Sequence, residues 1–152
     1  MKKQIIIFII LITAFLSCEK DDICIDAITP NLIIRFYNDT LQTELKKVEL
    51  DSVWAINKNG LSAYKGVSTD SIAIPLDLTE NTTKYIIENN SVKDTIEFSY
   101  SRNDVFVSRS CGYKTIFDNL QISNNTNNWI KSITINNTTI SDEKAAHINI
   151  YH

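Results

Sequence analysis

Apolar and polar residues alternate along most of the chain beyond residue 30. In the first such stretch, Leu32, Ile34 and Phe36 share one face. A period of two residues, with many β-branched and aromatic side chains, predicts half-buried β-strands. The further apolar rows are Val48, Leu50, Trp54 and Ile56; Ile72, Ile74, Leu76 and Leu78; Tyr85 and Ile87; Ile96, Phe98 and Tyr100; Val105 and Val107; Ile116, Leu120 and Ile122; Ile133 and Ile135; and Ile148 and Ile150.

Turn-forming residues separate these rows. Turns are expected at residues 57–60, 89–91, 102–104 and 124–128, all of which contain asparagine. Asparagine tolerates left-handed backbone angles, so it can replace glycine, which is scarce here. Pro75 lies inside an apolar row, which places that strand at a sheet edge or a bulge. Long segments of helical period are missing, and Ser141 to His147 has room for one or two helical turns.

The spacing of these segments sets the fold class. About nine short strands at roughly ten-residue spacing predict an all-β fold, an antiparallel β-sandwich with immunoglobulin-like or transthyretin-like topology. Internal repeats of about 20 to 50 residues are missing, and no linker is long enough to divide the chain. We therefore expect a single domain.

The first 17 residues have the order of a secretory signal peptide. A lysine-containing start is followed by an apolar stretch from Ile5 to Leu16 and by the small Ser17. That stretch is too short to cross a bilayer, which takes about 20 apolar residues. Cys18 directly after Ser17 resembles the cleavage point of a bacterial lipoprotein, where the thiol is lipidated and becomes the mature N-terminus.

This leader divides the chain into three parts. We expect a signal peptide over residues 1–17, a lipidated tether over 18–30 and the β-sandwich over 31–152. Removal of the two leader lysines changes the formal net charge from −3 to −5. The remaining basic residues are scattered, whereas nucleic-acid binding requires a concentrated basic surface. The membrane is therefore an expected partner, through the lipid, and nucleic acid is not.

The cysteine count fits export. If Cys18 carries lipid, Cys24 and Cys111 remain as one pair, which an oxidising compartment would join. Such a bond is worth roughly 4 to 5 kcal/mol in the chain-entropy model. The alternative is two free thiols, one of them reactive. A nucleophilic Cys111 would need a histidine base, for which His147 is the candidate.

Other catalytic and metal-binding patterns are weak. The two histidines, His147 and His152, belong to no cluster with zinc-ligand spacing. Acidic residues at 21, 22 and 26 match no calcium loop. The segment 108–112 lacks the bracketing glycines and the following helix of a nucleophile elbow. We expect no enzyme, no cofactor and no metal.

Two tryptophans are candidate platforms for sugar rings. Trp54 and Trp129 are large enough to stack on a sugar, but both also lie where core residues are expected. Because an aromatic side chain buries much apolar area, a core position is the favoured interpretation for each.

The whole mature chain resembles a family of small lipoproteins of the Bacteroidetes type that form a domain of unknown function. The resemblance rests on the start from Cys18 to Cys24, the stretch from Thr29 to Phe36, the region of Tyr100, and the stretch from Val107 to Gly112. It implies a tethered β-domain with a link between Cys24 and Cys111, and it implies no known activity.

The same resemblance implies two signals. Lys20, Asp21 and Asp22 resemble a surface-export signal of such lipoproteins, although an ordinary charged tether has the same composition. Surface display is expected, and attachment to the periplasmic face of the outer membrane is the alternative. Four Asp-Ser/Thr-aliphatic triplets resemble O-glycan acceptors of such bacteria, although strand starts contain these residues anyway. Their acceptor positions are Thr40, Ser52, Ser71 and Thr95.

Together these features favour a lipid-anchored, non-enzymatic module that binds another envelope protein or a surface glycan. Loops carry function on a rigid scaffold, so residues 101–104 and 124–128 are the expected binding loops. One alternative is a structural accessory subunit of an outer-membrane assembly. A carbohydrate hydrolase is the third hypothesis, because paired carboxylates are not recognisable from spacing alone.

Overall fold

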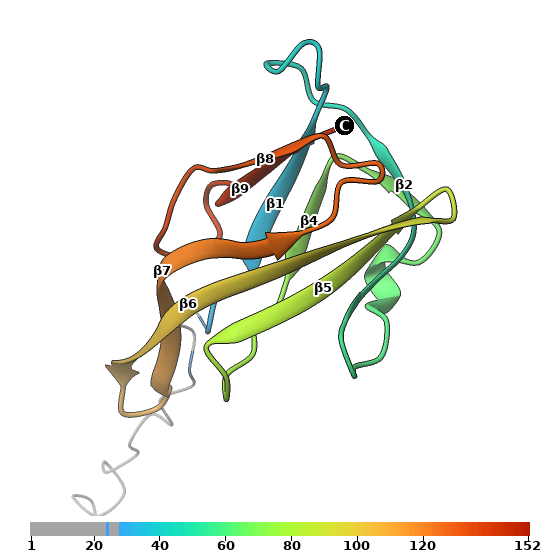
Figure 1. The fold of residues 1–152 in the computed structure, drawn as a ribbon. Helices are drawn as coiled ribbons and strands as arrows, with labels where there is room; N and C mark the ends of the chain where they lie inside the picture. Colours follow the sequence, from blue (N-terminus) through green and yellow to red (C-terminus); the bar gives the residue numbers. More distant parts are fainter. Residues whose placement is uncertain (1–23, 25–27) are drawn as a thin grey trace, which may run out of the picture.

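The computed structural model describes Cys24 and residues 28–152 (Figure 1). This part of the chain contains nine strands and one short 3₁₀ helix, η1 (Ser62–Tyr64). The strands are β1 (Leu32–Tyr37), β2 (Val48–Ala55), β3 (Val67–Thr69), β4 (Ser71–Ile74), β5 (Thr82–Asn89), β6 (Val92–Ser108), β7 (Gly112–Asn125), β8 (Ser132–Ile135) and β9 (Ile148–Tyr151).

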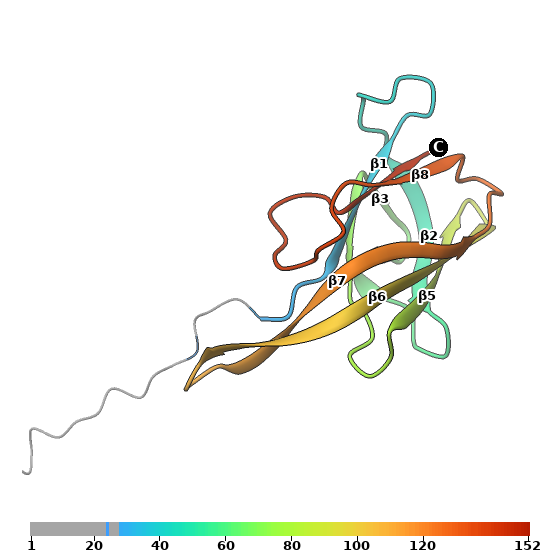
Figure 2. The same ribbon diagram turned by 60° about the vertical axis from the view of Figure 1, so that its left-hand side comes forward.

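The strands form two sheets that pack face to face. One sheet has the order β4-β1-β9-β8, and the other has the order β3-β2-β5-β6-β7 (Figures 1 and 2). The predicted all-β sandwich is therefore confirmed. One pair departs from the antiparallel expectation, because β1 and β9 run parallel. Large core side chains come from both sheets, and they include Phe36, Ile72, Ile74, Ile148 and Ile150 from the first, and Leu50, Val53, Tyr85, Ile87, Ile96, Phe98, Phe117 and Leu120 from the second.

Local sequence explains several elements directly. The alternation in β1 buries Leu32, Ile34 and Phe36. Pro75 directly follows β4, and β4 is an edge strand, as expected. The turn between β5 and β6 has positive φ at Asn90 and Ser91, at 49° and 63°. Positive φ at both central residues is the geometry of a type I′ hairpin, which matches the right-handed twist of the strands.

The turn predicted at residues 102–104 is wrong. Arg102, Asn103 and Asp104 lie in the middle of β6 and pair with residues 115–117 of β7. Beyond Tyr100 the β6–β7 hairpin leaves the sandwich, and β6 is exposed from 101 to 106. Polar residues therefore occupy a solvated strand there. We call residues 103–108 and 112–116 the arm, whose tip projects from the sandwich (Figure 2).

Two further expectations differ from the structure. Residues 141–147 form bends and no helical turn, and Asp142 Oδ1 accepts the backbone N–H of Lys144 there. The short edge strand β3 was not expected, because its three residues, Val67 to Thr69, are too few to show a periodic pattern. It pairs with the start of β2.

Candidate functional site

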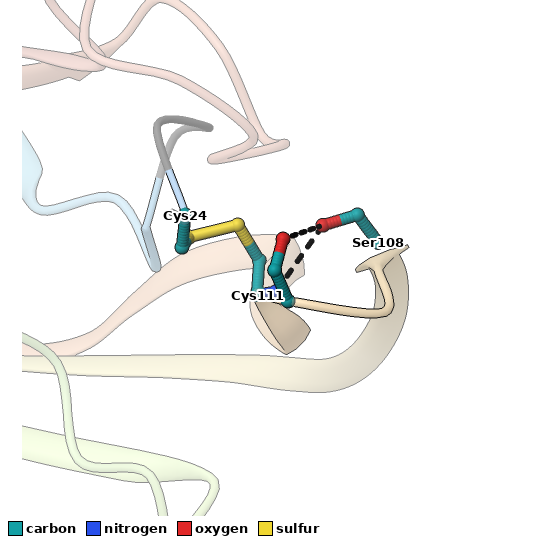
Figure 3. The surroundings of a disulfide bond; sticks show 4 residues. Cys24, Ser108 and Cys111 are labelled. Carbon is teal, nitrogen blue, oxygen red and sulfur yellow. Dashed lines mark hydrogen bonds between the residues drawn. A yellow bond between two sulfur atoms is a disulfide. The ribbon is translucent and has the colours of Figure 1, made fainter. Parts of the chain in front are cut away.

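A disulfide fastens the tip of the arm to the start of the described chain. Cys24 and Cys111 are bonded, with their Cα atoms 4.9 Å apart and a separation of 87 positions in sequence (Figure 3). Ser108 Oγ accepts the backbone N–H of Cys111 at 3.2 Å and bonds the Ser110 hydroxyl. The turn that closes the arm is thus organised around Cys111, and neither sulfur is a free thiol in this geometry.

The residues assigned to the anchor lie outside the described part of the chain. These are Cys18, the expected lipidation site, and Lys20, Asp21 and Asp22, the expected sorting signal. Lipidation and sorting therefore stay predictions.

The two tryptophans have different environments. Trp129 is a core residue, 9% exposed, whose indole N–H donates to the carbonyl of Ile87. Trp54 is half-buried, and the ammonium of Lys93 lies 5.5 Å from the centre of its ring. The core interpretation is correct for Trp129 and wrong for Trp54.

A bulge in β2 explains the position of Trp54. The pairing of β2 with β5 shifts by one residue between Leu50 and Ser52. An extra residue reverses which side chains face the core, because side chains alternate along a strand. Val53 is therefore fully buried in place of Trp54.

Trp54 begins a row across the outer face of the second sheet. It pairs with Ile86 of β5, which pairs with Thr95 of β6. Thr95 lines an open hollow of about 190 Å³, which we call the polar hollow. Its other lining residues are Lys84, Glu97, Asn124, Asn125 and Thr126. Two of these residues, Lys84 of β5 and Glu97 of β6, form an ion pair of 2.8 Å. The surface thus offers an aromatic ring, hydroxyls, amides and both charge signs.

A buried carboxylate holds the loop beside this hollow. Asp94 is fully buried. Its Oδ1 accepts the Thr126 hydroxyl and the Asn128 N–H, at 2.7 and 2.8 Å. Its Oδ2 accepts the N–H groups of Trp129 and Ile130, both at 2.8 Å. A buried charge is tolerated when its acceptor sites are filled in this way. The residue therefore fixes the loop at 126–130.

The four expected glycan acceptors differ in accessibility. Thr40 is exposed, as are both neighbours in its triplet, in the loop after β1. Ser52, Ser71 and Thr95 are half-buried within strands, and the Ser71 hydroxyl donates to the carbonyl of Ile34. Within the folded domain, Thr40 is the acceptor position open to an enzyme.

Tyrosine hydroxyls hold one wall of a second hollow on the sandwich. This hollow of about 290 Å³ is lined by Tyr85 and the segment 75–78. The Tyr85 hydroxyl donates to the carbonyl of Pro75, and the Tyr100 hydroxyl donates to that of Asp77. Burial raises the pKa of Tyr85 and of Tyr100, so both remain neutral donors. Their hydroxyls tie this segment to the sheet.

The histidines also have structural roles. His147 Nδ1 accepts the backbone N–H of Ile33 at 3.0 Å, so this ring links the chain before β9 to β1. Burial lowers the pKa of His147 and that of His152. No group of three or more His, Cys, Asp or Glu side chains among the described residues is placed to hold a metal ion. Within the same residues, no helix has the length and apolarity needed to cross a membrane.

Comparison with known families adds one assignment. A family model matches residues 51–152, which is about two thirds of the chain. The chain belongs to the family of unknown function DUF6452. The match to DUF6452 begins within β2, so it includes Trp54, Asp94 and Cys111 and starts after Cys24. No curated protein and no solved structure matches the chain. An immunoglobulin-like or transthyretin-like topology therefore stays a prediction.

Proposed function

We propose that this DUF6452 chain is a lipid-anchored outer-membrane lipoprotein of the Bacteroidetes type. Its β-sandwich acts as a non-enzymatic module that binds a surface glycan or another envelope protein. The anchor is supported by the order of the leader over residues 1–17 and by Cys18 directly after it. The membrane attachment is on the cell surface or on the periplasmic face.

The observation that carries the binding proposal is the outward position of Trp54, on the same sheet face as the polar hollow and separated from Thr95 by Ile86. An indole can stack on a sugar ring or anchor a protein contact, and amides and hydroxyls supply paired donors and acceptors. The hollow is smaller than the pockets of about 300–1,000 Å³ that enclose drug-sized ligands. It therefore suits part of a larger ligand, such as one residue of a glycan chain or one side chain of a protein.

The position of this surface relative to the disulfide supports the same proposal. Thr95 precedes Ser108 by 13 residues along the continuous strand β6. At about 3.3 Å per residue, the polar hollow lies about 40 Å along the strand from the tip of the arm. A module tethered at one end and binding near the other can reach a ligand away from its attachment.

A binding assay with a matched variant tests the proposal. Lipidated protein purified from membranes is applied to a glycan array and to crosslinking in native envelopes, as wild type, Trp54→Ser and Leu41→Ser. Leu41 is 53% exposed in the loop after β1, so it controls for loss of an exposed apolar side chain. Trp54→Ser should weaken binding by about tenfold or more, and Leu41→Ser should not.

Three results separate the hypotheses. Binding that survives Trp54→Ser at wild-type strength removes this surface from the proposal. A single protein crosslinked at fixed stoichiometry, through residues away from Trp54, favours the structural accessory subunit. Turnover of a glycan on the array overturns the non-enzymatic role.

A further inference from the structure

The tip of the arm has an exposed apolar surface that nothing in the described part of the chain covers. Phe106 and Tyr113 pair across the hairpin with ring centroids 5.4 Å apart, and they are 55% and 71% exposed. Ile28, 78% exposed, lines a hollow together with Tyr113 and Cys24. Single exposed apolar residues are ordinary, but three gathered at one end of a hairpin form a patch. We call Ile28, Phe106 and Tyr113 the tip patch.

The chemistry around the tip patch matches a lipid headgroup region. Residues 105–114 contain two charged side chains, Arg109 and Lys114, both of them basic, although the whole chain has a net charge of −3. Basic side chains are attracted to anionic lipids. Tyrosine, with an apolar ring and a polar hydroxyl, is enriched where a bilayer meets water.

Covalent structure sets the distance from the tip patch to the proposed anchor. The disulfide holds the tip to Cys24, which follows Cys18 by six residues. Six residues span at most about 20 Å even when fully extended. A lipid on Cys18 therefore keeps the tip within about 20 Å of the bilayer, where its local concentration at the membrane is high.

We infer that the tip patch inserts into the headgroup region of the bilayer that holds the Cys18 lipid. This inference rests on the proposed lipid anchor. The domain then has two membrane contacts, the lipid and the tip of the arm, and these fix its orientation. Weak affinity of the patch suffices, because the lipid already supplies the attachment.

Quenching by brominated lipids in proteoliposomes tests this contact. Lipidated protein is reconstituted as wild type, Phe106→Trp and Leu41→Trp, in vesicles whose lipids carry bromine near the headgroup end of the acyl chains. The loop that contains Leu41 lies at the end of the molecule away from the arm (Figures 1 and 2). After subtraction of the wild-type signal, quenching in Phe106→Trp should exceed that in Leu41→Trp by about twofold or more.

The outcomes distinguish failure of the tip contact from failure of the proposed lipid anchor on Cys18. An intact mass without acyl chains on Cys18 overturns the anchor and, with it, the tip contact. Acylated protein in which Phe106→Trp is quenched no more than Leu41→Trp overturns the tip contact alone. A photo-crosslinker at position 106 that captures a protein in native envelopes, rather than lipid, also overturns it.

Discussion

Replacing Asp94 with asparagine tests how the loop beside the polar hollow is held. An amide keeps one oxygen, but it puts an NH₂ group, which cannot accept a hydrogen bond, in place of the other. If that group replaces Oδ2, the N–H groups of Trp129 and Ile130 lose their acceptor. If it replaces Oδ1, the N–H of Asn128 loses its acceptor. A hydrogen bond to a charged group contributes about 1.5–3 kcal/mol, so we expect Asp94→Asn to lower the free energy of unfolding by about 3 kcal/mol.

Urea unfolding at neutral pH, with hydrogen exchange of the loop amides, measures this effect. Asp51→Asn is the matched control, because Asp51 is exposed and one of its oxygens accepts a single backbone N–H, that of Ser91. It should cost less than about 1 kcal/mol. The reasoning fails if the two variants unfold with equal free energies, or if the Trp129 and Ile130 amides keep their protection in Asp94→Asn.

Three further predictions concern the disulfide, pH and modification. Changing both Cys24 and Cys111 to serine should lower the free energy of unfolding by about 4 kcal/mol, because the bond closes a long loop; a loss below about 1 kcal/mol in urea unfolding would contradict this. Because burial lowers the pKa of His147, stability is full above the ordinary histidine pKa and falls as the pH drops below it. His147→Asn keeps an acceptor for the Ile33 N–H, so it should reduce the dependence of the urea midpoint on pH. An unchanged pH dependence would show that it does not come from His147. If the chain carries an O-glycan, Thr40→Ala should remove it from the intact mass, whereas a retained glycan would place it elsewhere.

Apart from the three-residue strand β3, alternation along the chain predicted the strands that lie wholly within the sandwich. It could not predict the orientation of Trp54, because the bulge depends on how β2 pairs with β5, more than thirty residues away in sequence. The local signal was Val53, a β-branched residue three positions after Leu50, where strict alternation expects a polar side chain. If the apolar row is continued from Leu50 to Val53 instead of to Trp54, it places Val53 in the core.

The arm and the loop held by Asp94 could not be predicted from the sequence for a different reason. Polar residues at 102–104 have the composition of a turn, and only their pairing with β7 shows that the strand continues. Asp94 stood out only as part of a glycan-acceptor triplet. Its four hydrogen bonds come from residues 126–130, and nothing near Asp94 in the sequence indicates them. Both features depend on contacts between distant segments.

The parallel pairing of β1 with β9 constrains the order in which the domain can form. In the sheet order β4-β1-β9-β8, the last strand of the described residues, β9, lies between β8 and the first described strand, β1. A chain that emerges N-terminus first, from a ribosome or through a translocation channel, therefore has no partner for β8 until residues 148–151 are free. Contacts between segments this far apart in sequence also slow folding. The topology thus delays completion of the first sheet until residues 148–151 are available, whereas the strands of the second sheet, β3-β2-β5-β6-β7, can pair before then.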